Sequence, residues 1–408
     1  MTTQGDGRIE IRGGGLLALT ALLLLAFSAM VAMPFNISGI VDGFAASNAA
    51  AGTVASIEMA AVAVSVLFCA RFIARVPPQR VYLTALIVLA VVHLATLTVS
   101  QVEVLYGTRL IAGLAAGAVV ATVMGIAGRS TTPEATFGVI NSCVGVMGML
   151  LALILPRALR LGEWLPGELR PVDGLYLVYF VFALLALAFV RRAPAPPAVS
   201  PTTAAGAVSA PLPWHGWLAL FGLGLIFFGH ALLAVFIVEI GLAVPLTAEV
   251  IGIVFLFGSG FGVVAPLVAG WLGVRIRAAV PVLVVLLALI GTGLLLARAA
   301  TPLAFYIAGP FYAMMPIAMM PFVLGALSRV DLSGRLAGAH PAFVMLGGAA
   351  APLIGGAIRD FSGDFIGNGL AMAVCVAVGS ALLARTVLAS DRLRASHAAP
   401  PAATAKAG

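Results

Sequence analysis

The chain has 408 residues, of which 62% are hydrophobic and only 9% are charged, and its mean hydropathy is +1.15. This composition excludes a soluble domain, which needs far more polar residues to cover its surface. The formal net charge of +7 does not indicate nucleic-acid binding, because the arginines are spread over short segments and form no single basic face. We therefore predict an integral membrane protein whose surroundings are the lipid bilayer.

Apolar stretches long enough to cross a bilayer recur along the whole chain. A membrane-spanning helix needs about 20 mostly apolar residues. Twelve such stretches are predicted, at residues 15–38, 51–73, 81–100, 105–128, 136–158, 174–190, 215–239, 248–273, 279–298, 303–327, 337–357 and 367–388. The predicted fold class is an all-α membrane protein with twelve transmembrane helices.

A polar break divides these stretches into two sets of six. Residues 191–213 begin with two arginines and continue as an Ala/Pro/Ser/Thr run that cannot form a core. We predict an N-terminal tail at 1–14, six-helix bundles at 15–190 and 214–389, and a disordered tail at 390–408. No cleavable signal peptide is evident, because the first apolar stretch is long enough to span and others follow directly.

Arginine and lysine are distributed unequally between the two sides of the membrane. With both chain ends on one side, the other side keeps only Arg157, Arg160, Arg170, Arg298 and Arg359. Positive charge gathers on the cytoplasmic side of membrane proteins. Both termini are therefore predicted to be cytoplasmic, in a cytoplasmic (inner) membrane.

The two halves align when the numbering is shifted by 200 residues. The matched pairs are Ala70 with Gly270, Arg75 with Arg275, Gly138 with Gly338, Val144 with Val344, and Gly148 with Gly348. Duplication at this scale is how many secondary transporters are built. It predicts two pseudo-symmetric bundles.

One ionisable residue lies inside a membrane-length apolar stretch. Arg109 is followed at four-residue steps by Gly113 and Gly117. A charge at this place is expensive and indicates a function by default. The two glycines share a helix face and predict close packing with a neighbouring helix.

With this pattern, the chain resembles the major facilitator superfamily over nearly its whole length, and in that family the Arg109 pattern is associated with proton coupling. Family members usually carry Gly-x-x-x-Asp-Arg-x-Gly-Arg-Arg after the second span. Here Arg75 and Arg80 remain in that loop, and Gly270 and Arg275 remain in its counterpart, but the aspartate is missing from both. In the family this aspartate helps to latch the halves on the cytoplasmic side, so the latch is not expected in that form.

The resemblance also bears on gating and direction. Exporters of the family often carry Gly-Pro-x-x-Gly-Gly in the fifth span, which is absent from residues 136–158. Residues of that kind lie instead in the eleventh span, as Gly348, Pro352 and Gly355. The resemblance implies that spans two, five, eight and eleven gate the halves, so these three are predicted packing and gating residues.

Glu58 is the predicted partner of Arg109. Both follow the inward direction of their spans to nearly the same depth, at 1.5 Å of rise per residue. Opposite charges at matched depth can pair, which offsets much of the burial cost. A carboxylate whose partner changes with conformation is a reasonable proton switch. The alternatives are a permanent structural ion pair, or an Arg109 side chain that snorkels to the headgroups.

Three further polar residues are candidate cavity contacts. His230 lies near the middle of its span, where an imidazole suits a proton relay or a substrate hydrogen bond. Asn36 and Asn141 offer amide hydrogen bonds, with interhelical packing as the equal alternative. His93 lies in the third span, which the resemblance makes peripheral, so it is predicted to be an ordinary buried residue.

The stretch at 303–327 is rich in aromatic residues, methionine and proline, and includes Tyr306. Proline and glycine predict local loosening of this helix. Aromatic and methionine side chains form an adaptable apolar surface, which would suit an amphipathic substrate. Methionines that simply fill helix contacts are the alternative.

No motif for soluble catalysis, metal binding or ATP hydrolysis occurs in the sequence. We predict no enzyme activity, cofactor or metal, and a monomer with a small-molecule substrate and protons as coupling ion. The predicted function is proton-coupled alternating-access transport of an amphipathic organic compound, with efflux favoured. The alternatives are uptake of an organic anion paired with Arg109, or a membrane sensor that binds solute without moving it.

Overall fold

The structure is a computed structural model. It describes residues 8–46, 48–70, 76–163, 169–195, 212–234, 236–244, 246 and 248–398. The described chain is almost entirely helical, and its only β-type pairing is an isolated bridge between Ile9 and Ser130. Seven of the described helices are long and apolar enough to cross a membrane.

The first half of the chain forms one bundle. Its helices are α1 (Gly14–Ala26), α2 (Ser28–Val31), α3 (Met33–Phe44), α4 (Asn48–Ala70), α5 (Pro78–Thr96), α6 (Val102–Gly128), α7 (Pro133–Ala158) and α8 (Pro171–Leu187), with short 3₁₀ turns η1 (Leu161–Glu163) and η2 (Val190–Arg192). Proline opens α5, α7 and α8, at the position where its missing N–H has no intrahelical partner to lose.

The second half forms a matching bundle. Its helices are α10 (Trp214–Ala234), α11 (Ile237–Ala243), α12 (Ala248–Gly273), α13 (Ala279–Ala297), α14 (Pro302–Val330), α15 (Arg335–Ser362) and α16 (Ile366–Ala398). Helix by helix, these begin close to 200 residues after their counterparts in the first bundle. Two pseudo-symmetric six-helix bundles were predicted from the sequence, and the fold confirms them.

The first predicted span is divided into three helices and the seventh into two. The first stops at Ala26, resumes as the single turn α2 and continues as α3, while the seventh stops at Ala234 and resumes at Ile237. Breaks at membrane depth release backbone carbonyls, which need donors from neighbouring helices. None of these interruptions was predicted from the sequence.

The tenth span behaves in the opposite way. The loosening predicted there is not observed, because α14 runs unbroken for 29 residues through Pro310, Pro316 and Pro321. It packs against α12 and α13 on its own side and against α7 of the other bundle. Tertiary packing therefore holds a helix that its prolines alone would weaken.

The last helix is longer than predicted. It continues to Ala398, so residues 390–398 are helical instead of disordered, and residues 399–408 lie outside the described residues. Two side chains tie the extension down. Asp391 accepts hydrogen bonds from the backbone N–H of Ala278 and of Ala279, and Arg394 donates to carbonyls at the end of α12.

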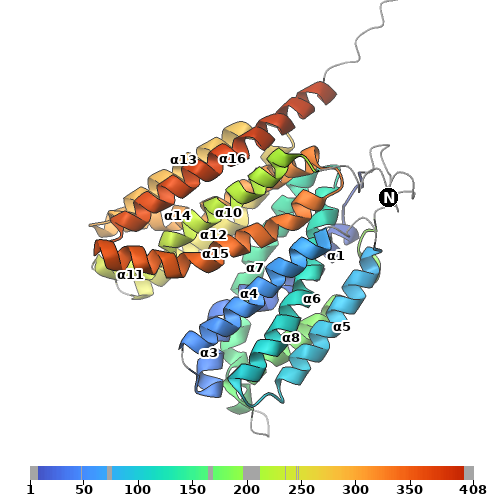
Figure 1. Cartoon of the computed structure of the whole chain (residues 1–408), viewed down its shortest axis with the longest axis vertical. Coiled ribbons are helices and arrows are strands. Elements are labelled where there is room, and N and C mark those ends of the chain that lie inside the picture. The colour runs from blue at the N-terminus through green and yellow to red at the C-terminus, as the bar shows by residue number, and fades with distance from the viewer. Residues whose placement is uncertain are drawn as a thin grey trace, which may run out of the picture.

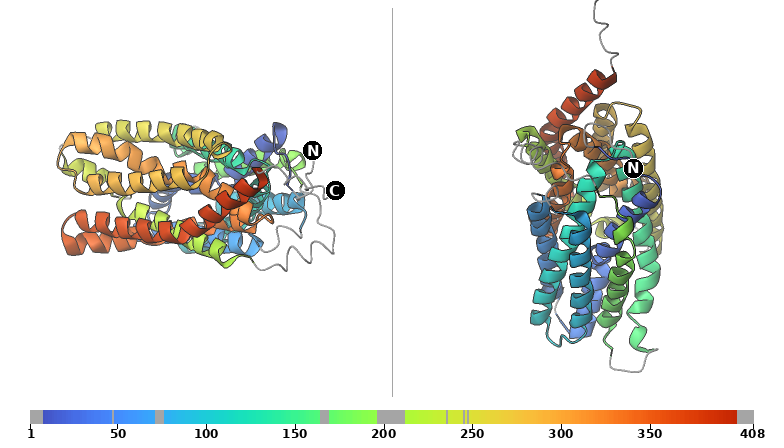
Figure 2. Two further views of the ribbon diagram at one scale, coloured as in Figure 1. Left: turned by 90° about the horizontal axis from the view of Figure 1, so that it is seen from above. Right: turned by 90° about the vertical axis from the view of Figure 1, so that its right-hand side faces the viewer.

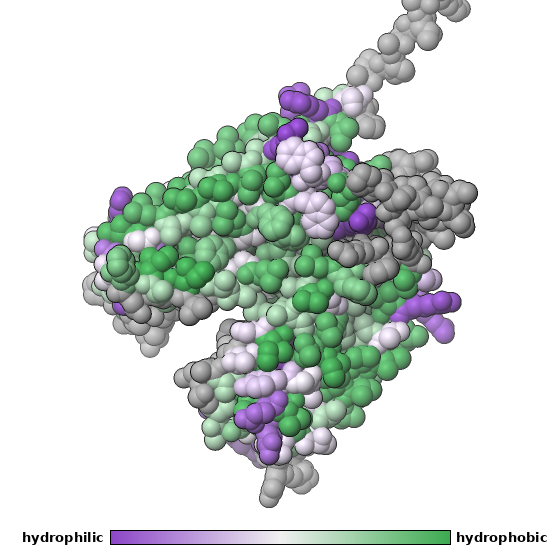
Figure 3. Space-filling model, viewed as in Figure 1, coloured by the Kyte–Doolittle hydropathy of each residue, from purple (hydrophilic) through white to green (hydrophobic). Residues whose placement is uncertain are grey.

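The two bundles meet at one end of the molecule and diverge toward the other (Figure 1). We call the end where α1 begins and α16 ends the closed end, and the end formed by the tips of α3, α11 and the α15–α16 turn the open end. Figure 2 shows the helices of each bundle running side by side along this direction. The space-filling view in Figure 3 shows a hollow between the bundles at the open end.

Backbone-to-backbone contacts hold the bundles together. A Cβ atom on Gly138 of α7 would lie 2.9 Å from Cα of Gly270 in α12. Nearer the closed end, a Cβ on Gly334 would clash with the carbonyl oxygen of Gly125. Gly334 has a left-handed φ of 77° where α15 starts, which a side chain would strain. Glycine is therefore required where the halves touch.

Candidate functional site

Arg109 of α6 is enclosed inside the first bundle. Its side chain is 2% exposed, and the residues around it come from α4, α5 and α8. It faces neither lipid nor the hollow between the bundles. The side chain does not snorkel to a headgroup region, so its charge must be compensated by its neighbours.

Four side chains surround the guanidinium. Nη1 lies 3.9 Å from Oε1 of Glu58 and 3.4 Å from Nδ1 of His93. Nη2 donates to Oγ1 of Thr96 at 2.8 Å, and Cζ lies 4.5 Å from the centre of the Tyr176 ring. Glu58, His93 and Thr96 are all buried. The predicted pair Arg109–Glu58 is thus present as an ion contact, while the shortest contact goes to a neutral hydroxyl.

The polar cluster continues to the broken first span. The His93 ring lies 5.6 Å from the ring of Tyr179, whose hydroxyl donates to Oδ1 of Asn36 at 2.6 Å. The Asn36 amide in turn donates to the carbonyl of Ala29 at 2.8 Å, one of the carbonyls near the helix break. Asn36 therefore connects the Arg109 cluster with the kinked first span, and the network draws on five helices, α3, α4, α5, α6 and α8.

Gly113 and Gly117 bring α4 against α6. Cβ atoms at these positions would lie 2.5 Å from the carbonyl oxygen of Glu58 and 2.6 Å from that of Val62. Ser65 of α4 also donates to the carbonyl of Leu114 at 2.6 Å. This close approach is what places Glu58 at the depth of Arg109.

His230 belongs to a separate cluster in the second bundle. Its ring lies 4.8 Å from the ring of Tyr312, whose hydroxyl donates to the His230 carbonyl at 2.6 Å. Within the described structure, Nε2 of His230 has no hydrogen-bond partner. Asn141 bonds its own helix, donating to the Phe137 carbonyl at 2.8 Å. Neither residue is brought to Arg109.

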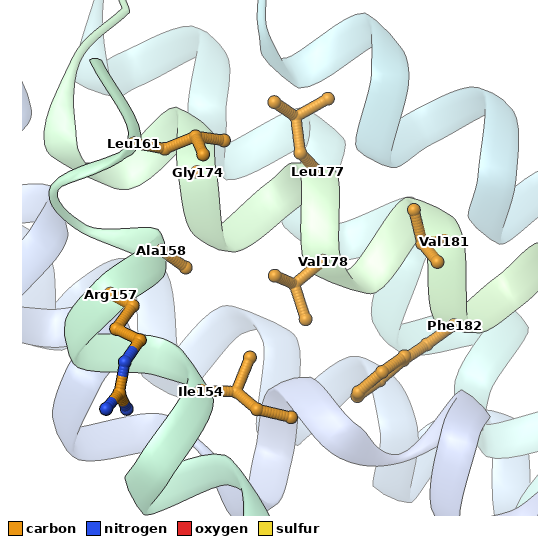
Figure 4. Close-up of a pocket in the computed structure, with 9 residues that line it drawn as sticks. All are labelled: Ile154, Arg157, Ala158, Leu161, Gly174, Leu177, Val178, Val181 and Phe182. Atoms are coloured by element: carbon orange, nitrogen blue, oxygen red, sulfur yellow. The ribbon is translucent and has the colours of Figure 1, made fainter. Parts of the chain in front are cut away.

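Tyr306 lies in an apolar groove of about 480 Å³ between α12 and α14, with Phe257, Phe261 and Phe311. A second apolar groove, of about 500 Å³, lies between α7 and α8, and Figure 4 shows its lining, including Leu177 and Phe182. Figure 4 also shows that the Arg157 guanidinium turns away from this groove. Both grooves lack the clustered charges found around Arg109.

The predicted gating residues of α15 differ in their surroundings. A Cβ on Gly355 would lie 3.1 Å from the carbonyl oxygen of Leu232 in α10, whereas one on Gly348 would meet nothing within 4 Å. Pro352 lies between them in the same unbroken helix. Gly355 therefore packs α15 against α10, and Gly348 faces open space.

The predicted loop motif is only partly described. Arg75 lies outside the described residues, and Arg80 is exposed at the start of α5. Arg275 stacks over the ring of Trp271, with Cζ 4.1 Å from the ring centre. Neither described arginine bridges the bundles.

A different set of residues connects the two bundles at the closed end. Glu134, at the start of α7, forms a salt bridge with Arg329, at the end of α14. Arg8 donates to the carbonyl of Ser130 at 2.9 Å in one bundle and to that of Ser328 at 3.0 Å in the other. These residues were not predicted from the sequence, and they join the two bundles.

The sequence matches the profile of the Major Facilitator Superfamily over residues 18–352, which is most of the chain. The chain belongs to this superfamily of transporters. A search of curated proteins finds no match.

Solved structures of superfamily members have the same fold. The E. coli fucose:proton symporter FucP has a TM-score of 0.74 at 12% identity, covering 91% of this chain and 98% of FucP. The proton:xylose symporter XylE has a TM-score of 0.65 at 14% identity, with 94% and 98% covered. The human organic anion transporter MFSD10 has a TM-score of 0.63 at 15% identity, with 93% and 98% covered.

Sequence reasoning missed four members of the cluster in this facilitator: His93, Thr96, Tyr176 and Tyr179. Each pair is spaced three residues apart, which places its members on one helix face. Polar pairs at this spacing in two neighbouring apolar spans were the available signal.

Proposed function

We propose that this protein is a proton-coupled secondary transporter of a small amphipathic organic compound, working by alternating access. The observation that carries the proposal is the buried Glu58–Arg109 contact of 3.9 Å inside a facilitator fold. A charged pair sealed in a membrane bundle needs a reason to be kept, because apolar residues of similar size would be at least as stable. Transfer of a proton is such a reason.

The proposed orientation in the membrane indicates which conformational state of the transport cycle the structure represents. With both termini in the cytoplasm, the closed end faces the cytoplasm and the open end faces outside. The hollow seen in Figure 3 is then an outward-open cavity. Closing it requires the opposite end to separate, which breaks the Glu134–Arg329 bridge.

The principal candidate residues have proposed roles. Glu58 carries the proton and Arg109 is its charge partner, while Asn36 connects their cluster with the kinked first span. In the second bundle, the unpartnered Nε2 of His230 is a candidate hydrogen-bonding group for substrate. The gating glycines allow α15 and its neighbours to slide during the exchange of states.

The proposed direction is efflux, because α14 offers aromatic and methionine side chains typical of surfaces that accept varied apolar molecules. Uptake is the second candidate. It is favoured by the missing fifth-span export pattern and by the fold shared with the symporters FucP and XylE.

Transport in proteoliposomes with an imposed pH gradient tests the proposal. Ethidium serves as an amphipathic probe and benzoate as an anionic one, each measured with both gradient directions. We expect gradient-driven ethidium accumulation that Glu58→Gln abolishes, while exchange of probe without a gradient persists. Full accumulation by the Glu58→Gln protein would exclude a coupling role for this carboxylate.

A further inference from the structure

His93 contacts Arg109 in a way that restricts its own protonation. Thr96 Oγ1 donates its proton to the Val92 carbonyl at 2.7 Å, so this hydroxyl can only accept from Arg109. The guanidinium has N–H donors and no acceptor. At 3.4 Å from Nη1, Nδ1 of His93 must therefore be the accepting nitrogen of a neutral imidazole.

The Arg109 guanidinium thus has two alternative sets of partners. One is the Glu58 carboxylate on α4, and the other is the neutral acceptor pair His93 and Thr96 on α5. In the outward-open state the shorter contacts, 2.8 and 3.4 Å, go to α5 and the longer one, 3.9 Å, to Glu58. A proton on Nδ1 of His93 would set N–H against N–H and displace Arg109 toward Glu58.

We infer that His93 is a second proton-accepting group of this site, and that Arg109 moves between Glu58 and the His93–Thr96 pair according to which group carries the proton. The inference rests on the proposed proton-coupled function. A proton on Glu58 removes the anion and leaves Arg109 with α5. When the proton binds His93 Nδ1 instead, Glu58 is ionised and takes Arg109.

Among the residues that the structure describes, no other charge on the neighbouring helices competes for these positions. The groups facing His93 are Arg109 of α6, Tyr176 and Tyr179 of α8, and Glu58 behind Arg109. Asp173 of α8 is engaged by Arg170 at 2.8 Å. α1 carries no titratable residue, and the arginines of η2 lie at the far end of α5.

The network also connects the His93–Thr96 pair with the kinked first span. Movement of the kinked first span would shift Asn36, then Tyr179, and with it the ring that packs on His93. Substrate-driven movement of that span would change the environment of His93 without touching it. His93 is accordingly a positioning residue for Arg109.

Charge movement after external pH steps tests the inference without a substrate. Proteoliposomes on a solid-supported membrane are stepped through pH values that span carboxylate and imidazole titration. We expect the wild-type response to spread over a wider pH range than one site produces. His93→Gln keeps a neutral acceptor for Arg109, and should preserve folding while narrowing the response to a single titration.

His340→Gln is the matched control, since His340 is also buried and bonds only its own helix, at 2.7 Å from the Ala337 carbonyl. It should retain the wild-type response. A wild-type pH range for His93→Gln, with charge movement lost in Glu58→Gln, would overturn the role of His93 alone. Unchanged charge movement in Glu58→Gln would instead contradict the proposed function.

A spectroscopic measurement covers the case in which His93→Gln does not fold. Nitrogen NMR of ¹⁵N-histidine-labelled wild-type protein, with His93 assigned through His93→Asn, reports the tautomer. The expected form at neutral pH is neutral with the proton on Nε2. A proton on Nδ1 would contradict the acceptor role of His93, on which the proposed movement of Arg109 depends.

Discussion

The interiors of the two bundles differ far more than their folds. Shifted by 200 residues, the positions of Glu58, His93 and Arg109 are all glycine: Gly258, Gly293 and Gly309. In the second bundle, a Cβ on Gly293 would lie 2.8 Å from the Tyr312 ring, so that ring occupies space corresponding to the imidazole. Duplication preserved the helices, whereas only one copy holds the ionisable cluster.

Both bundles nevertheless solve the same backbone problem. Asn36 donates to a carbonyl beside the break in the first span. In the seventh span, Tyr312 donates to the carbonyl of His230 and Asn368 to that of Leu232. Hydrogen bonds at the breaks are therefore common to both halves, whereas the buried Glu58–Arg109 contact lies in the first half.

The largest expected effect comes from removing the cation of the charged half. Arg109→Met leaves the Glu58 carboxylate buried without its charge partner, which costs about 3–5 kcal/mol of stability. The double variant Glu58→Gln/Arg109→Met should recover most of the loss, because the bundle then resembles its uncharged counterpart. Thermal unfolding in nanodiscs measures both, and a double variant less stable than the single one would contradict the comparison.

Next in size is the close packing that brings α4 to α6. Gly113→Val places a side chain against the Glu58 carbonyl, and overpacking of this kind costs about 1–3 kcal/mol. Gly107→Val on the same helix is the control, because a Cβ there meets nothing within 4 Å. Equal unfolding temperatures for the two variants would show that the glycine contact does not hold Glu58 in place.

A smaller effect is expected where the second bundle satisfies its broken helix. Tyr312→Phe removes the hydroxyl that bonds the His230 carbonyl, for a loss of about 0.5–1.5 kcal/mol. Tyr179→Phe removes a comparable bond in the first bundle but also disconnects Asn36 from the Arg109 cluster. Charge movement after pH steps should therefore change only in Tyr179→Phe, and a change in both would remove the distinction between the halves.

The smallest effect is expected from an exposed pair on the first bundle. Hydrogen bonding from Arg160 holds the pKa of Glu163 below its usual range, so any stabilisation is present at neutral pH and is lost as the pH falls through the folded-state value. Both side chains are exposed, and solvent screens such pairs. Glu163→Gln should leave the unfolding temperature at neutral pH unchanged, in contrast to Arg109→Met.

Much of the fold could be predicted because lipid imposes a length and a composition on every span. The start of α6 at Val102 and of α12 at Ala248 lies within three residues of the predicted limits. The breaks at Phe27 and Phe236 could not be predicted, because neither position carries proline or glycine, whereas the interruption at Ala32 lies two residues before Pro34. Their carbonyls find donors on helices that are distant in sequence.

The site was predicted unevenly for a similar physical reason. Arg109 and Glu58 stand out as isolated charges, and their depth follows from counting residues. His93 was treated as ordinary because its span is peripheral, but a peripheral helix still presents one face to its own bundle. Glu134 and Arg329 were not singled out, because they lie far apart in the sequence at the ends of α7 and α14, and only the contact of the two halves makes them partners.

The short segment ahead of α1 joins the two bundles. Arg8 donates hydrogen bonds to a carbonyl of each bundle, and Ile9 pairs with Ser130. The segment at Arg8 and Ile9 therefore connects the two bundles at the closed end. Any movement that separates the bundles at the closed end must first break the hydrogen bonds of Arg8. Fusion partners or affinity tags placed just before Arg8 would therefore alter turnover without contacting the transport pathway. Tags placed after Ala398 would leave the Arg8 hydrogen bonds intact.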